Sequence, residues 1–185
     1  MCTRTVFGRI GLPTLIALTL AGCASPQGKF RSQKDPSYNE KIGRVLVVYY
    51  NVDTTSSLGR GFSDRFATRV AALLTQKSVP SEIVRMEREA LDRNAPVKAA
   101  TARFRPRQFL SFAVTRVDSM GGVHQAAPGQ LLQFSSEMTA TFEFSLADAQ
   151  SGRTVWRTEA HYYSPPRAED VADQLLEQLP VAGLF

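Results

Sequence analysis

The sequence predicts an α+β domain, a two-layer sandwich in which helices pack on one face of one mixed β-sheet of about five strands. Three observations predict it. Residues 132–146 alternate between apolar even and polar odd positions, with Ser136 as the exception, the period of a strand with one face on a core and one in water. Residues 62–74 carry apolar side chains at helical spacing, and residues 44–51 form a continuous β-branched and aromatic run typical of a buried strand.

The other elements follow from weaker patterns. A short helix from about Val97 to Ala102 is predicted in a charged segment, with Pro96 at its start. A glycine-rich loop at 121–129 and a turn at 148–152 separate the last strands. In chain order the longer elements are a strand at 44–51, a helix at 62–74, strands at 79–86, 108–118, 132–146 and 154–163, and a helix at 168–179.

The amino-terminal residues have the parts of a secretory signal peptide. Two arginines, with no acidic residue beside them, precede a mostly apolar run at 10–20. A run of about 11 residues is well short of the roughly 20 that cross a bilayer as a helix, so a permanent transmembrane span is a poor interpretation. The run ends in Leu20-Ala21-Gly22-Cys23, where two small residues stand directly before a thiol.

This motif resembles the lipobox of bacterial lipoproteins. The resemblance implies that Cys23 is acylated and becomes the first residue of the mature protein, because a thiol can form a diacylglyceryl thioether. The acyl chains would then hold the protein on a membrane. The next residue is Ala24 and not an aspartate, which resembles sorting to the outer membrane, with the domain on its periplasmic face. The alternative is an ordinary secretory signal with an incidental cysteine.

Three parts are therefore predicted along the chain. Residues 1–22 are the signal peptide, residues 23–41 the lipidated cysteine and a flexible tether, and residues 42–185 a single periplasmic α+β domain. The segment from Ala24 to about Lys41 has almost nothing to bury, so its composition cannot offset its ordering entropy. A coil of this length spans roughly 23 Å, and we expect the domain to stand away from the membrane.

Length, charge and cysteine content narrow the classes of function. About 145 residues remain for the domain, enough for one sizeable core. Cys2 leaves with the signal and Cys23 takes the lipid, so the mature protein has no thiol for a disulfide, a metal site or nucleophilic catalysis. The formal charge of +5 falls to +3 without Arg4 and Arg9, which suits an anionic envelope surface. Export removes the protein from nucleic acid.

A second resemblance covers the later elements. The long amphipathic strand, the turn at 148–152, the strand containing Trp156 and a closing helix are similar to small envelope lipoproteins with a domain like the amino-terminal domain of TolB. Penicillin-binding-protein activator and curli-secretion lipoproteins are among them. The likeness extends over element order at 44–179 and over residues at 148–156. It implies a fold, and no functional residue is carried over from it.

One cluster of side chains is a candidate binding site. Arg103, Arg105 and Arg107 alternate with a phenylalanine and a proline. In an extended segment the three guanidinium groups would lie on one side and could bind a phosphate or carboxylate of an anionic lipid, lipopolysaccharide or peptidoglycan. The alternative is a solvated edge strand that its charges keep soluble.

Other motifs point away from catalysis. His124 and His161 stand without a His-Glu-x-x-His motif, a cysteine pair or clustered carboxylates, so neither a metal nor a cofactor is predicted. Gly59 and Gly61 lack the lysine of a phosphate loop and the third glycine of a dinucleotide site, and are predicted to give freedom at a helix start. No Gly-x-Ser-x-Gly or Ser-x-x-Lys motif is present.

These features predict a non-enzymatic accessory or binding subunit of an envelope assembly or transport machine, anchored on the outer membrane, with another envelope protein as its partner. One alternative is a lipid or lipopolysaccharide transport component, which needs an apolar groove between helices and sheet. A second is an envelope hydrolase, which needs a pocket with perturbed carboxylates.

Overall fold

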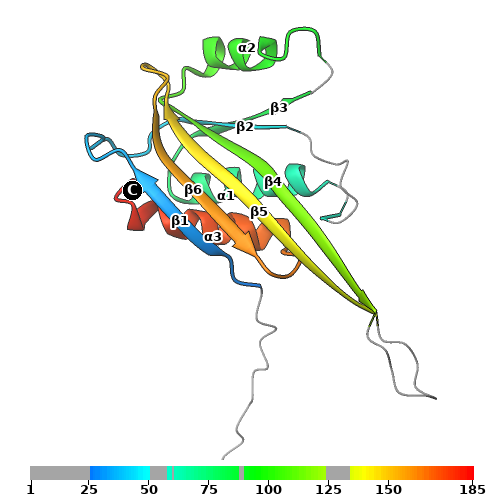
Figure 1. The fold of residues 1–185 in the computed structure, drawn as a ribbon. Coiled ribbons are helices and arrows are strands. Elements are labelled where there is room, and N and C mark those ends of the chain that lie inside the picture. The colour runs from blue at the N-terminus through cyan, green and yellow to red at the C-terminus, as the bar shows by residue number, and fades with distance from the viewer. Residues whose placement is uncertain (1–25, 51–57, 60, 88–89, 124–133) are drawn as a thin grey trace, which may run out of the picture.

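The computed structural model describes residues 26–50, 58–59, 61–87, 90–123 and 134–185. They form one mixed sheet of six strands, in the order β1-β6-β5-β4-β2-β3, with three helices (Figure 1). The predicted α+β class is confirmed, and no helix in the described part of the chain is long and apolar enough to cross a membrane. The elements are β1 (Lys29–Lys34), β2 (Val45–Tyr50), α1 (Phe62–Gln76), β3 (Ser81–Met86), α2 (Ala95–Phe104), β4 (Gln108–Val123), β5 (Phe134–Asp148), β6 (Thr154–Tyr162) and α3 (Ala168–Val181).

The predicted glycine-rich loop at 121–129 is partly wrong. β4 runs on to Val123, so Gly121 and Gly122 lie inside a strand, opposite Ser136 and Ser135 of β5. Pairing along this stretch satisfies the glycine backbone groups, which outweighs the poor strand propensity of the residue. The strand therefore ends at Val123, later than the two glycines suggest.

The largest departure from the sequence prediction lies in the segment expected to be a flexible tether. β1 is an edge strand antiparallel to β6, from Lys29 opposite His161 to Lys34 opposite Trp156. Phe30 is its one apolar side chain packed against the core. The strand is ordered mainly by backbone hydrogen bonds to the open edge of β6, and no local composition reveals such an edge.

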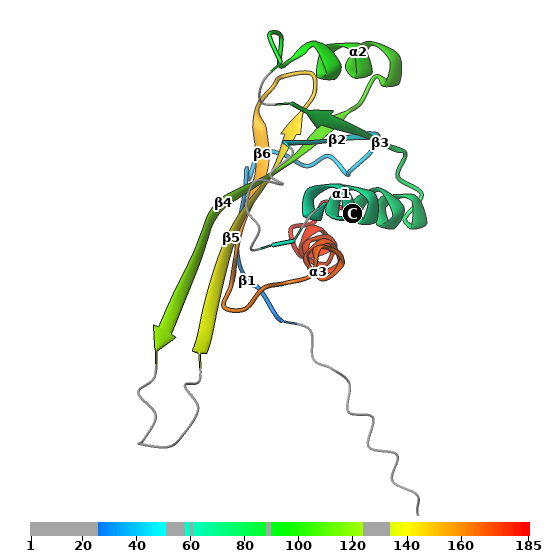
Figure 2. The same ribbon diagram turned by 90° about the vertical axis from the view of Figure 1, so that its right-hand side faces the viewer.

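The handedness of the crossovers explains where the helices lie. β3 and β4 are both parallel to β2, and the chain moves outward from β2 to β3 through α1 and back across β2 to β4 through α2. Because both connections favour the right hand, the two helices have to lie on opposite faces. α1 and α3 share one face, as predicted, whereas α2 packs on the other face against β2 and β3 (Figure 2). The molecule thus has a partial third layer at one end of the sheet.

The core lies between the sheet and the α1–α3 layer. From Ala140 to Leu146 the even positions of β5 are at most 1% exposed, as the alternation predicted. Trp156 of β6 is buried in the same layer. Aromatic rings fill the centre of this space, with centroid separations from 4.3 to 6.4 Å, and they belong to Phe62 and Phe66 of α1, Phe112 of β4, and Phe142 and Phe144 of β5.

β4 and β5 continue beyond the rest of the sheet as a two-stranded arm, defined here as residues 117–123 and 134–140. β6 pairs with β5 only as far as Ala140, and β2 pairs with β4 only as far as Phe112. The two strands go on pairing with each other to the end of the arm. Figures 1 and 2 both show the arm directed to the end of the molecule where the described chain begins.

Candidate functional site

The face of β4, β5 and β6 that lies opposite α1 and α3 is polar and holds an open hollow of about 410 Å³. Side chains at odd positions of β5 and β6 form much of this face, because successive side chains of a strand point to opposite faces. We refer to it as the sheet-face hollow. Its lining includes Arg116, Asp118, Thr141, His161 and Tyr163.

A β-bulge in β4 brings two charged side chains to this hollow. Thr115 is an extra residue between Val114 and Arg116 in the pairing with β5. The insertion shifts the alternation by one, so that Val117 continues on the core side. Arg116 and Asp118 consequently lie on the open face, where they form an ion pair. No residue pattern in β4 indicated this change of facing.

His161 of β6 is fixed by a neighbour on each side of its ring. Its Nδ1 lies 3.1 Å from Thr141 Oγ1, and its Nε2 lies 3.3 Å from Glu159 Oε1. The side chain is 35% exposed. Hydroxyl, imidazole and carboxylate make the set of groups used in acyl transfer, but β5 is paired with a strand on each side here. Its amides are used in the sheet and are not aimed at a developing oxyanion.

Charges of both signs compensate one another across the open face. Arg157 donates to Glu143 with an N–O distance of 2.9 Å, joining β6 to β5. The ammonium of Lys29 on β1 lies 5.0 Å from the ring centre of Tyr163. The face is therefore polar, and its charges are densely paired.

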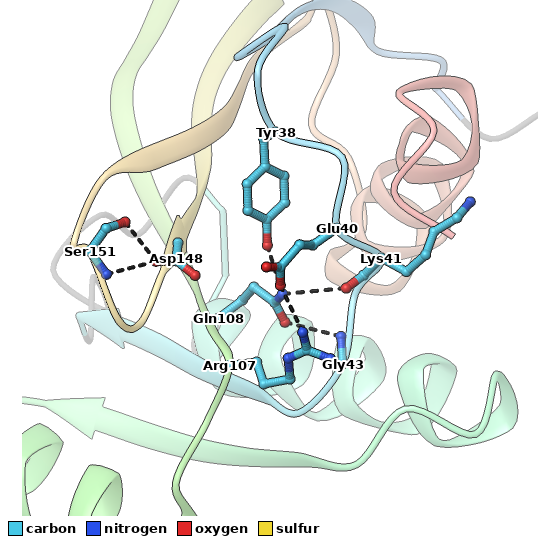
Figure 3. Close-up of polar contacts among 8 residues, drawn as sticks. All are labelled: Tyr38, Glu40, Lys41, Gly43, Arg107, Gln108, Asp148 and Ser151. Carbon is cyan, nitrogen blue, oxygen red and sulfur yellow. Dashed lines mark hydrogen bonds and ion pairs between the residues drawn. The ribbon is translucent and has the colours of Figure 1, made fainter.

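A second hollow, of about 360 Å³, lies at the start of β4, and we refer to it as the Arg107 corner. Arg107 donates to Glu40, with an N–O distance of 2.7 Å (Figure 3). Asp148, at the end of β5, also faces this hollow. The lining residues are Glu40, Thr101, Arg105, Pro106, Arg107, Asp148, Ala149 and Gln150.

The fully buried amide of Gln108 fastens the chain before β2 to the Arg107 corner. Its Nε2 donates to the Tyr38 hydroxyl at 2.8 Å and to the Lys41 carbonyl at 3.4 Å. Its Oε1 accepts from the Gly43 amide at 3.0 Å (Figure 3). The bonds to Tyr38 and Lys41 order residues that were predicted to belong to the tether. A glutamine at an even, core-facing position of β4 is the one signal that could have drawn attention to them.

The three predicted anion-binding arginines do not line up on one side. Arg103 lies in α2, not in an extended segment, and pairs with Glu82. Arg105 ends that helix in the left-handed conformation, at φ 51°. Arg107 is held by Glu40. The expected geometry is wrong because the helix continues through residue 104; Arg105 alone keeps its guanidinium without an ionic partner among the described residues.

The remaining sequence candidates have structural explanations or fall outside the description. Gly59 and Gly61 have φ of 85° and 71° before α1, a conformation that glycine adopts without strain, so the predicted freedom at the helix start is confirmed. His124 lies outside the described residues. Within the described ranges no three His, Cys, Asp or Glu side chains are placed to hold a metal.

Two carboxyl groups in turns have lowered pKa values. Bonds from the hydroxyl and the amide of Ser151 lower the pKa of Asp148, and Ser37 does the same for Asp35. A lowered folded-state pKa contributes stability above the ordinary value near 3.8, and this is lost as pH falls through the folded pKa. The cause is local turn hydrogen bonding, which is a structural role and not a sign of acid–base chemistry.

The side chain of Gln174 in α3 binds the first described residues of the chain, and we refer to these contacts as the Gln174 clamp. Gln174 donates from Nε2 to the Pro26 carbonyl at 3.0 Å and accepts on Oε1 from the Gly28 amide at 2.8 Å. The Tyr162 hydroxyl donates to the same Oε1 at 3.1 Å. A Cβ on Gly28 would lie 2.6 Å from Cζ of the Tyr162 ring, so only glycine lets the chain lie this close. Sequence reasoning missed Gln174, which stands beside an apolar helical stripe with no distinguishing neighbour.

The sequence matches no known family and no curated protein. Among solved structures, a PelC dodecamer from Paraburkholderia phytofirmans carrying a leucine-to-methionine substitution shares 18% identity at a TM-score of 0.48, covering 80% of this chain and 96% of that one. A second PelC dodecamer shares 20% at 0.46, covering 79% and 89%. A PDZ domain protein from Parabacteroides distasonis shares 12% at 0.40, covering 82% of this chain and 34% of that one. Likenesses at this level carry no argument about function or assembly.

Proposed function

We propose that the protein is an outer-membrane lipoprotein, acylated at Cys23, whose periplasmic domain is a non-enzymatic accessory or binding subunit of an envelope assembly or transport machine. The observation that carries the proposal is the Leu20-Ala21-Gly22-Cys23 motif at the end of a short apolar run. The fold is compatible with it, because Gln174 of α3 bonds Pro26 and Gly28, so contacts of the domain reach to within three residues of Cys23.

The open face of the sheet is the surface that we assign to the partner. β1, β6, β5 and β4 present it; among the described helices α2 lies on this side, but it packs on β2, β3 and Phe109 at the start of β4. The ion pairs of Arg116 with Asp118 and of Arg157 with Glu143, and the part of the sheet-face hollow around Thr141 and His161, would meet a polar protein surface at modest desolvation cost, as in the rim of many interfaces. The partner is accordingly another envelope protein.

The structure gives less support to the transport alternative. A carrier would need an apolar groove between helices and sheet, and stacked phenylalanines fill that space. Phe66, Phe142 and Phe144 are 0% exposed, and Phe62 and Phe112 are 3% exposed. A lipid tail would have to displace these rings.

The anchor is tested by replacing its thiol. Cys23→Ser should abolish incorporation of labelled fatty acid and should leave an unprocessed precursor, because a hydroxyl does not form the thioether. Cys2→Ser is the matched control, since that cysteine lies in the predicted signal. Continued labelling of the Cys23→Ser protein would show that the anchor lies elsewhere.

The partner surface is tested by photo-crosslinking in cells. A photoreactive residue at Glu143, on the open face, should capture one specific envelope protein. The same residue at Glu177, exposed on α3, is the control and should not capture it. Equal capture from both positions would contradict the assignment of the open face.

A further inference from the structure

The clamp at Gln174 fixes the chain very close to the predicted lipid attachment. It holds Pro26 and Gly28, and β1 begins at the next residue. Only Ala24 and Ser25 separate Cys23 from the first clamped residue. Three steps between consecutive Cα atoms, each 3.80 Å, reach about 11 Å at most. The long tether expected from composition would have allowed roughly twice that distance even as a relaxed coil.

The residues beside the clamp are of kinds that suit the surface of a bilayer. Tyr163, which follows β6, is 65% exposed, and the ammonium of Lys29 lies over its ring. The exposed Arg167 stands before α3 and reaches Glu169 at 3.8 Å, an acid that it shares with Arg65. Aromatic rings and long cationic side chains are enriched where protein meets the headgroup region.

The arm formed by β4 and β5 points to the same end. Both views place the free end of the arm on the side of the molecule where the described chain starts, away from the turn that joins β5 to β6 (Figures 1 and 2). β6 is 9 residues long, so the turn lies roughly 30 Å from the clamp along the strand. The domain therefore has a near end, which carries the Gln174 clamp, and a far end, which carries the β5–β6 turn.

We infer that the Gln174 clamp seats the near end of the domain, with Tyr163, Lys29 and Arg167, against the surface of the bilayer that holds the acylated Cys23. The inference rests on the proposed function, because it needs the lipid. It goes beyond it by fixing the orientation of the domain: the β5–β6 turn and the Arg107 corner face away from the membrane.

The test uses the full-length lipoprotein reconstituted alone into vesicles of phosphatidylethanolamine and phosphatidylglycerol. Single cysteines replace Ser164, at the near end, or Gln150, at the far end, and each is labelled with a fluorophore. With Cys23 acylated, the introduced thiol is the one free thiol of the mature chain. Nitroxide-labelled lipid headgroups should quench the label at Ser164→Cys several-fold more strongly than the label at Gln150→Cys.

Intact mass, measured first, separates the two levels of the proposal. Acylated protein with equal, weak quenching at both positions would overturn the orientation and leave the anchor standing. Protein without acyl chains would overturn both. In a second variant, about twenty Gly and Ser residues are inserted between Ser25 and Pro26. The segment between Cys23 and the clamp then spans about 25 Å as a coil, and quenching at Ser164→Cys should fall several-fold. Unchanged quenching in this variant would show that the short segment between Cys23 and Pro26 does not hold the near end at the bilayer.

The clamp itself is tested with Gln174→Ala, which removes both bonds and lets the chain leave the domain as far as β1. The reach from Cys23 to Lys29 then rises to about 23 Å. Quenching at Ser164→Cys should decrease partway towards that of the inserted variant, and amide exchange at Gly28 should accelerate. Gln178→Ala, one turn further along α3, is the matched control and should change neither. A Gln174→Ala protein that keeps full quenching would overturn the clamp as the positioning residue.

Discussion

The two faces of β5 carry residues from the same stretch of chain and do different work. Even positions such as Phe142 are sealed under α1 and α3, whereas odd positions such as Thr141 line an open polar surface. Burial of the covered face stabilises the fold, since each buried aromatic ring contributes about 2 to 3 kcal/mol to the free energy of unfolding. The open face contributes little to stability and can therefore be used for binding. Substitutions on each face test this division.

Phe142→Asp should destabilise the fold by several kcal/mol, because an unpaired carboxylate would replace a fully buried ring. Its neighbour Thr141→Asp should cost about 0.5 to 1 kcal/mol, since the side chain is on the open face and loses one contact with His161. Urea unfolding of both variants measures the difference. Equal losses would show that both faces of β5 are covered.

Gln108→Ala tests a polar side chain that is fully buried on the covered face. The substitution leaves the Tyr38 hydroxyl and the Gly43 amide without their partner in a partly buried setting, and we expect a loss of about 1 to 3 kcal/mol. Gln33→Ala on exposed β1 is the control and should change the unfolding midpoint very little. A small effect of Gln108→Ala would mean that water replaces the amide.

Tyr162→Phe tests a titratable group on the covered face. Burial first, and the charge of Asp170 second, raise the pKa of Tyr162 above its ordinary value of 10.0. The folded state holds this proton more tightly than the unfolded chain, so the related stability is present below pH 10 and is lost as pH rises above it. At neutral pH the variant should lose about 1 kcal/mol with the bond to Gln174. Its difference from wild type should shrink above pH 10, in urea titrations across that range.

Arg157→Ala tests the open face itself. Its ion pair with Glu143 is solvent-exposed, so its removal should cost about 0.5 kcal/mol or less, and the cost should fall further at high salt. A double-mutant cycle with Glu143→Ala measures the coupling. A coupling well above 1 kcal/mol would show that the open face also maintains the fold.

The comparison also shows where sequence reasoning succeeds. Period two in β5 and the helical stripes predicted α1, α3 and the buried side of β5, because burial of one face is a local property of the pattern. β1 was missed because its order comes from the edge of β6, whose nearest partner residues stand more than a hundred positions away. The bulge at Thr115 was missed because an inserted residue is visible only in the register with β5. The alignment of the three arginines failed because α2 continues through residue 104.

The pairing of β1 with β6 has a consequence for biogenesis. Ser32 bonds Thr158 across 126 positions, so β1 can be seated on β6 only after nearly the whole chain has been synthesised. Until then the edge of β6 is an open template for a foreign strand. A chain that lacks residues 26–34 should keep that edge exposed and should self-associate on a sizing column, whereas the complete chain should not. The amino-terminal strand would thus act as the last closing step of maturation as well as the attachment of the domain.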